Sequence, residues 1–121
     1  MPRVVHFEIH ADQPERAVKF YSSVFGWKID TWGGPVPYWL ITTGPDGEPG
    51  INGAIKDRVE KLTTVNTVSV PSVDDFLKNI TTAGGKALTQ KMAIPGIGYH
   101  AYCEDTEGNV FGIMQDDPSA K

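Results

Sequence analysis

VVHFEIHADQPERAVKFYSSVFGW, residues 4–27, predicts a β-strand followed by an amphipathic helix. Apolar and polar residues alternate over residues 4–10, which is the two-residue period of a half-buried strand. Asp12 is then expected to cap the helix, with Glu15 three residues later completing a capping box. Apolar residues follow at helical spacing until Gly26, where the helix is expected to end.

The chain repeats this plan after about sixty residues, the spacing typical of an internal duplication. Residues 64–86 (TVNTVSVPSVDDFLKNITTAGGK) again predict a strand and a helix, with Ser72 and Asp75 forming a second capping box. Three short strands are expected after each helix: 27–31, 38–43 and 51–55 in the first half, then 86–91, 98–104 and 109–115 in the second. The sequence therefore predicts an α+β fold of two tandem βαβββ modules. A half that cannot bury its own apolar face must pair with its twin, so function is expected where the halves meet.

Length and composition indicate one domain over residues 1–121, with module one at about 3–56, module two at about 64–116 and a tail that frays after 116. The net charge of −4 and the absence of a basic cluster argue against a nucleic-acid partner. Cys103 is the only cysteine, which indicates a reducing compartment. No apolar run is long enough to span a bilayer, and the chain does not open on a signal-peptide pattern. A cytoplasmic protein without a membrane partner is expected.

Two motifs carry a resemblance to a known superfamily. DQPERAVKFYSSVFGW (Asp12 to Trp27) opens the first half, and DTEGNVFG (Asp105 to Gly112) closes the second. Together they resemble the vicinal-oxygen-chelate superfamily, which includes glyoxalase I, extradiol dioxygenases, fosfomycin-resistance enzymes and bleomycin-resistance proteins. The resemblance covers nearly the whole chain. It implies two βαβββ modules that form a curled mixed sheet around a cavity, a small-molecule ligand and a homodimer.

The resemblance also implies four positions for the ligands of a divalent metal, from the first and fourth strands of each module. His6 fills the first position, whereas the corresponding residue of the second half is Asn66, which transition metals rarely use. The last-strand position is Gly112, and its counterpart in the first half is Gly53, or Asn52 if the register slips by one residue. Since a catalytic metal needs about three protein ligands, no four-ligand metal site and no cofactor are expected. A divalent metal stays possible with a rearranged set.

His6, Glu8 and His10 are the candidate catalytic residues, because alternation places all three on one face of the first strand. A carboxylate between two imidazoles suits proton transfer at a carbon next to a carbonyl without a metal. The alternative is that Glu8 forms a buried ion pair with a structural role. A fallback metal site would combine His6, Glu8 and His100.

The remaining candidates are substrate-binding residues on other strands. The alternating pattern places Trp39, His100 and Tyr102 on the face of His6 and Glu8. Leu40, Ala101 and Cys103 are expected on the opposite, packed face. The predicted substrate-binding set is Trp39, Asn66, His100 and Tyr102.

Three classes of function are compatible with these residues. The first is a protein that binds or transforms a small organic molecule in the cavity between the modules without the usual metal site. The second is a metal-dependent lyase, isomerase or dioxygenase with rearranged ligands. The third is a resistance protein that sequesters a drug or toxin. The missing ligands favour the first and third classes, and the residues leave open whether the chain is an enzyme or a binder.

Overall fold

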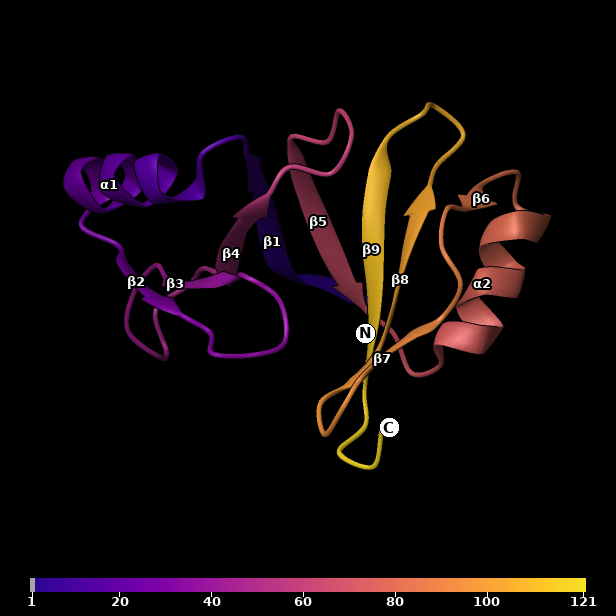
Figure 1. Ribbon diagram of the computed structural model, residues 1–121. Helices are drawn as coiled ribbons and strands as arrows, with labels where there is room; N and C mark the ends of the chain where they lie inside the picture. The colour runs from indigo at the N-terminus through magenta and orange to yellow at the C-terminus, as the bar shows by residue number, and fades with distance from the viewer. Residues whose placement is uncertain (1) are drawn as a thin grey trace. The chain divides into compact units, whose positions relative to one another are not determined.

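The structure, a computed structural model, describes residues 2–121 and has the predicted α+β architecture, with two helices and nine strands in that range (Figure 1). It divides into two compact units. One comprises His6–Val65, and the other comprises residues 2–5 together with Asn66–Lys121.

The first unit forms a sheet with one helix packed on it. Its elements are β1 (Arg3–Ala11), which belongs to this unit from His6 onward, α1 (Pro14–Phe25), β2 (Lys28–Thr31), β3 (Trp39–Thr42) and β4 (Asn52–Asp57). The strands run in the order β2-β3-β4-β1, with β1 parallel to β4 and the other pairs antiparallel. Side chains of α1, Ala17, Val18 and Tyr21 among them, cover a buried cluster of Ala11, Ile41 and Ile55.

The ends of α1 agree only in part with the sequence. Gly26 ends the helix as predicted, in a left-handed conformation (φ 70°) in which its N–H donates to the carbonyl of Ser22. The prediction of Asp12 as the cap is wrong. The helix begins one residue later than expected, after Gln13, with Pro14 in its first turn. The carboxylate of Asp12 instead accepts a hydrogen bond from Nε of Arg58 at 2.7 Å.

The second unit contains the other helix and the longest hairpin. The remaining elements are β5 (Thr64–Ser69), which belongs to this unit from Asn66 onward, α2 (Val73–Thr82), β6 (Lys86–Ala87), β7 (Met92–Ile94), β8 (Gly98–Glu104) and β9 (Val110–Asp116). The strand order is β5-β9-β8-β6, with β5 and β9 parallel and β7 also paired with β8. Its core is a cluster of Val70, Val73, Ala101, Cys103 and Ile113 beneath α2.

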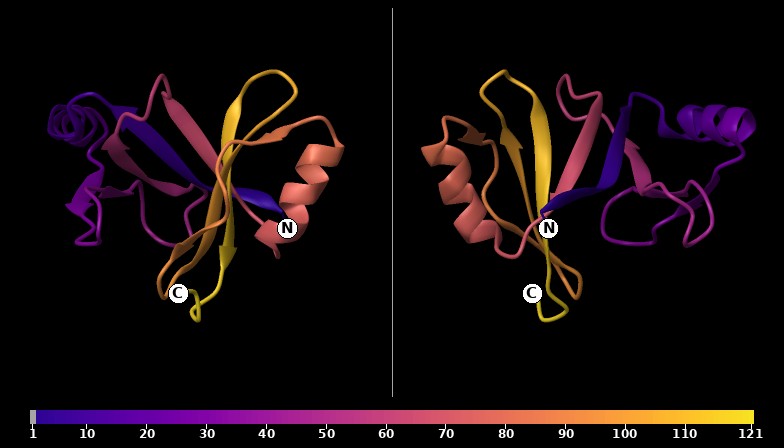
Figure 2. Two further views of the ribbon diagram at one scale, coloured as in Figure 1. Left: turned by 45° about the vertical axis from the view of Figure 1, so that its right-hand side comes forward. Right: turned by 180° about the vertical axis from the view of Figure 1, so that it is seen from behind.

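Two parts of the second unit differ from the prediction. β7 falls where the sequence indicates a loop, because a tight turn containing Gly96 (φ 75°) folds Met92–Ile94 back onto β8. The C-terminal tail does not fray. Ala120 is buried, and its carbonyl accepts a hydrogen bond from the N–H of Gly96, so the yellow C-terminus lies beside the orange β7–β8 turn (Figure 2).

The cap of α2 confirms the prediction for Ser72 and provides a test of it. Ser72 Oγ accepts a hydrogen bond from the N–H of Asp75 at 3.1 Å, whereas Gln13 makes no side-chain cap bond to α1. Replacing Ser72 with alanine is expected to lower the free energy of unfolding by about 1 kcal/mol. The matched change Gln13→Ala is expected to have little effect. Urea denaturation of both variants checks this, and equal losses would contradict it.

In the described part of the chain, no helix is both long and apolar enough to cross a membrane.

Candidate functional site

The pairing of β1 with β4 defines a polar face in the first unit. Residues directly opposite one another in a sheet project to the same side. Glu8 lies opposite Ala54, and His6 lies opposite Asn52, on the side of β1 that faces away from Phe7 and Ile9. Phe7 and Ile9 pack on the apolar cluster under α1. The alternation predicted for β1 is therefore confirmed, and His6, Glu8 and His10 share one face.

The register of β3 corrects the side predicted for Trp39. Trp39 lies opposite Ile55 and packs with the apolar cluster, whereas Leu40 lies opposite Ala54 on the face of Glu8. A strand has a period of two, so an error of one position reverses every side chain. The aromatic residue of this segment that lies on the polar face is Tyr38, whose hydroxyl reaches Glu8.

Glu8 is the centre of a buried hydrogen-bonded network. Its Oε1 lies 3.0 Å from Nε2 of His10, and its Oε2 accepts a hydrogen bond from the hydroxyl of Tyr38 at 3.2 Å. The side chain of Glu8 is 7% exposed and that of His10 is fully buried. Among the described residues, every buried side-chain nitrogen and oxygen has a hydrogen-bond partner. The carboxylate therefore replaces its lost water with fixed donors.

The network continues beyond Glu8 in both directions and fixes where its protons lie. The N–H of Val59 donates to Nδ1 of His10 at 3.3 Å, so His10 carries its proton on Nε2 and donates it to Glu8. An ionised Glu8 only accepts, so the proton of Tyr38 is directed toward Glu8. Nε2 of His6 lies 3.1 Å from the hydroxyl of Tyr38, whose own proton is already used, so Nε2 of His6 must donate.

This arrangement leaves one open position, Nδ1 of His6. Within residues 2–121, that nitrogen has no hydrogen-bond partner, and its ring is only half-buried. Burial lowers the pKa of His6 from its ordinary value, and the negative charge of Glu8 partly offsets the effect. Burial likewise lowers the pKa of His10 and raises that of the Tyr38 hydroxyl. His6 is therefore neutral at pH 7, with a lone pair on an accessible nitrogen.

In the second unit, the candidate residues occupy two different faces. Tyr102 lies opposite Gly112, which lies beside Thr67, and His100 lies opposite Met114 on the same side. The rings of His100 and Tyr102 meet edge to face at 4.6 Å. Both side chains lie on the face of the strand that is turned away from the core residues Ala101 and Cys103, as predicted. Asn66 lies beside Phe111 in the other row and is exposed, so Thr67 takes the position predicted for Asn66.

The four positions of the superfamily's metal ligands do not fit a metal here. A Cβ on Gly112 would lie 2.8 Å from Nε2 of His100, so that ring already fills the place of the missing ligand. In the first unit, Asn52 rather than Gly53 lies beside His6. The side-chain oxygen Oδ1 of Asn52 accepts hydrogen bonds from the N–H and the hydroxyl of Thr43. Across residues 2–121, no group of three or more His, Cys, Asp or Glu side chains could hold a metal ion.

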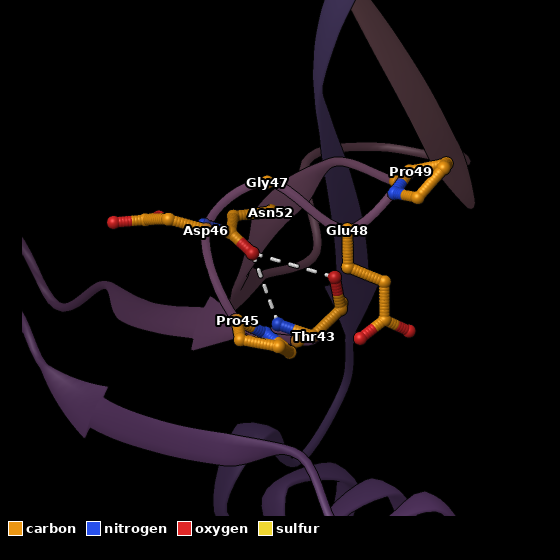
Figure 3. A pocket seen from close by; sticks show the side chains of 9 residues that line it. Thr43, Pro45, Asp46, Gly47, Glu48, Pro49 and Asn52 are labelled. Carbon is orange, nitrogen blue, oxygen red and sulfur yellow. Dashed lines mark hydrogen bonds between the residues drawn. The ribbon is translucent and has the colours of Figure 1, made fainter.

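The bonds of Asn52 shape a small pocket between β3 and β4, which Figure 3 shows from close by. The loop of residues 43–52 encloses about 160 Å³ there. A larger pocket of about 390 Å³ lies in the loop between β2 and β3 and includes Tyr38 and Trp39 in its wall. Small-molecule sites commonly measure about 300–1,000 Å³, so only the larger pocket has the size of one.

The sequence did not indicate Tyr38 as a site residue. A signal was present in the phase of β3, because a buried Ile41 places Trp39 on the packed side and Tyr38 on the polar side.

Known proteins resemble this chain in sequence and in fold. The family described as bleomycin resistance protein-like N-terminal matches residues 3–32. A glyoxylase-like domain-containing protein of Didymella fabae is 31% identical over 112 residues, which cover 88% of each chain. Methylmalonyl-CoA epimerase from Mycobacterium tuberculosis has a similar fold, with a TM-score of 0.70, 10% identity and coverage of 95% of this chain and 88% of that one. The Streptomyces coelicolor epimerase, in complex with 2-nitronate-propionyl-CoA, also reaches 0.70 at 12% identity, covering 100% and 99%. The chain belongs to the glyoxalase-like proteins of the vicinal-oxygen-chelate superfamily.

Proposed function

We propose that this protein binds a small organic carbonyl compound and removes a proton from the carbon next to the carbonyl, without the superfamily's four-ligand metal site. His6 acts as the base, and Tyr38 and Glu8 orient it and balance its charge. The observation that carries the proposal is the directed network from the open Nδ1 of His6 through Tyr38 to Glu8. A neutral imidazole backed by a buried carboxylate is a common arrangement for general base catalysis.

The proposed reaction moves one proton and no other atom. The C–H bond breaks, its electron pair passes into the carbonyl as an enolate, and the proton forms a bond to Nδ1 of His6. The imidazolium keeps its Nε2–H on the Tyr38 oxygen, while Tyr38 keeps its own proton on Glu8. The negative charge of Glu8 therefore stabilises the positive charge formed on His6. If the proton on Nδ1 is replaced by a solvent hydrogen before it returns, the carbon exchanges with solvent. Return of a proton to the opposite face of the enolate gives epimerisation.

The fold neighbours support this reaction class. They include a methylmalonyl-CoA epimerase in complex with methylmalonyl-CoA, and epimerisation at a carbon next to a carbonyl requires removal and return of one proton. The alternative of a rearranged metal site is disfavoured by the donors themselves. Nε2 of His6 is hydrogen-bonded to Tyr38 and both oxygens of Glu8 accept hydrogen bonds, so of these two residues only Nδ1 of His6 is left to bind a metal, whereas a catalytic metal needs about three protein ligands.

The direct test is deuterium incorporation into simple neutral carbonyl compounds in D₂O, followed by NMR. Replacing His6 with glutamine is expected to slow exchange by about 10²–10⁴-fold, the usual contribution of a general base. Tyr38→Phe is expected to slow it less, because the base is kept and only its orientation is lost. Tyr99→Phe is the matched control, since Tyr99 packs on the core of the second unit. Equal rates in wild type and His6→Gln would overturn the proposal.

The pH profile of exchange gives an independent readout. His6 must be unprotonated to act as base, so the rate falls as the pH drops through the pKa of His6. Since burial lowers that pKa, the midpoint is expected below the ordinary value of 6.5. A midpoint above 6.5 would contradict a neutral, half-buried base.

Metal analysis distinguishes the alternative class. The exchange activity is expected to survive dialysis against a chelator. Stoichiometric zinc, nickel, manganese or iron in the purified protein, lost in His6→Ala, would instead favour the rearranged metal site.

We also propose that the protein is a cytoplasmic homodimer. Phe20, Val24 and Phe25 of α1 are each more than half exposed, which is unusual for apolar side chains of one helix and supports association. Light scattering that gives the mass of a monomer at working concentration would contradict the dimer.

A further inference from the structure

The two ends of the loop between β2 and β3 are held together by hydrogen bonds and ring contacts. These contacts fix the shape of the pocket that the loop forms. Thr31, the last residue of β2, is paired with Trp39, the first residue of β3, and the N–H of Trp32 donates to the carbonyl of Tyr38 at 2.8 Å. The rings of Trp32 and Tyr38 meet edge to face at 5.7 Å. The residues between these contacts have both ends fixed, so the pocket of about 390 Å³ exists before any ligand arrives.

The wall of this pocket has a definite chemical character. It consists of glycines, prolines, Thr31, Val36, Tyr38 and Trp39, and none of these residues carries a charge. Gly33 adopts a left-handed conformation (φ 77°), and no atom lies within 4 Å of the place where its Cβ would be. Pyrrolidine and aromatic rings present flat apolar surfaces, whereas an ionised group would find no partner here.

Tyr38 joins the pocket to the Glu8 network. Tyr38 is one of the residues that line the pocket, while its hydroxyl is committed to Glu8 and His6. It therefore offers an incoming molecule an apolar surface rather than a free hydrogen-bond donor. A group bound in the pocket contacts the residue that orients the proposed base.

We propose that this pocket, which no similarity to known proteins assigns, binds a neutral aromatic or alicyclic group of the substrate. This inference rests on the proposed function in one respect: the group bound by the loop is part of the carbonyl compound that is the proposed substrate. Binding in the pocket itself requires only the loop and not the base. The two ideas can therefore fail separately.

The test uses indole as a neutral probe and indole-3-acetate as its charged counterpart, followed by amide NMR. Indole is expected to shift the signals of Gly33, Gly34 and Val36 in a saturable way, and to leave those of Gly47 and Gly50 in the smaller pocket unchanged. Indole-3-acetate is expected to bind about tenfold more weakly or worse, because its carboxylate loses hydration without gaining a partner.

Two variants make the test specific. Val36→Trp places a large side chain in the wall and is expected to abolish the indole shifts, whereas Ile97→Trp adds the same side chain at an exposed position outside the pocket and should preserve them. Saturable binding lost only in Val36→Trp supports the proposal. No saturable shift in the loop, shifts confined to Gly47 and Gly50, or equal binding of the charged probe would each overturn it.

His6→Gln separates this inference from the proposed function. If the variant loses proton exchange and still binds indole, both proposals stand. If wild type binds indole and exchanges no proton in any carbonyl compound, the proposed reaction fails and the pocket remains. If exchange occurs and the loop binds neither probe, the pocket fails alone.

Discussion

Replacement of Glu8 by alanine is expected to lower the free energy of unfolding by about 3–5 kcal/mol, the cost of removing one partner from a buried charged network. Nε2–H of His10 would lose its acceptor in a side chain that is fully buried. The hydroxyl of Tyr38 would lose its acceptor as well. Unsatisfied buried donors retain their full desolvation cost, so the loss exceeds that of an ordinary hydrogen bond.

Urea denaturation measures this loss, with Glu60→Ala as the matched control because Glu60 is exposed. The control is expected to change stability by less than about 0.5 kcal/mol, as surface substitutions usually do. The loss in the free energy of unfolding for Glu8→Gln should fall between those for Glu8→Ala and Glu60→Ala. The amide keeps one acceptor oxygen, but its NH₂ group would face another hydrogen-bond donor. A loss below about 1 kcal/mol for Glu8→Ala would mean that the network contributes no more than one ordinary hydrogen bond.

The second large effect concerns two glycines that the duplication makes look equivalent. A Cβ on Gly53 would lie 2.5 Å from the carbonyl oxygen of Phe7 and 2.6 Å from its ring, so the backbone of β1 would have to move. We expect Gly53→Ala to cost about 3 kcal/mol, at the upper end for overpacking. A Cβ on Gly112 meets mainly the ring of His100, which can rotate away. We expect Gly112→Ala to cost about 1 kcal/mol.

Thermal or urea unfolding of the two alanine variants distinguishes these sites. The comparison also tests the register of the strands. Gly53 lies beside Phe7 on the packed face of the first unit, whereas Gly112 lies beside Tyr102 on the face of the second unit that is turned away from its core. Equal costs, or a larger cost at Gly112, would contradict the assigned faces.

Much of the fold was predictable because local patterns and global packing agree. The alternation in β1 and the cap of α2 at Ser72 are both formed by residues close together in sequence. The errors are shifts of one position. Asn66 was aligned with His6 by counting one repeat, yet Thr67 lies beside Gly112, and Trp39 was placed on the face that Leu40 occupies. Sequence spacing in a duplicated chain is uncertain by about one residue, and in a strand that uncertainty exchanges the two faces.

The candidate site was predictable only where it lies within one strand. His6, Glu8 and His10 alternate in β1, so their common face follows from the sequence alone. Tyr38 reaches Glu8 from thirty residues away, and its contact depends on how β3 and the preceding loop fold. Val59, which fixes the proton of His10, donates a backbone N–H that any residue type except proline could supply. No side-chain pattern could have indicated it.

The hydrogen bonds of the network direct its protons toward Glu8 and leave Nδ1 of His6 open. Long-range ¹⁵N–¹H NMR of the histidine rings at neutral pH measures this directly. The structure predicts that His6 and His10 are both neutral and carry their protons on Nε2, as their bonds to Tyr38 and Glu8 require. A His6 ring protonated on Nδ1, whether as the other tautomer or as an imidazolium, would show that this nitrogen is not open to act as a base.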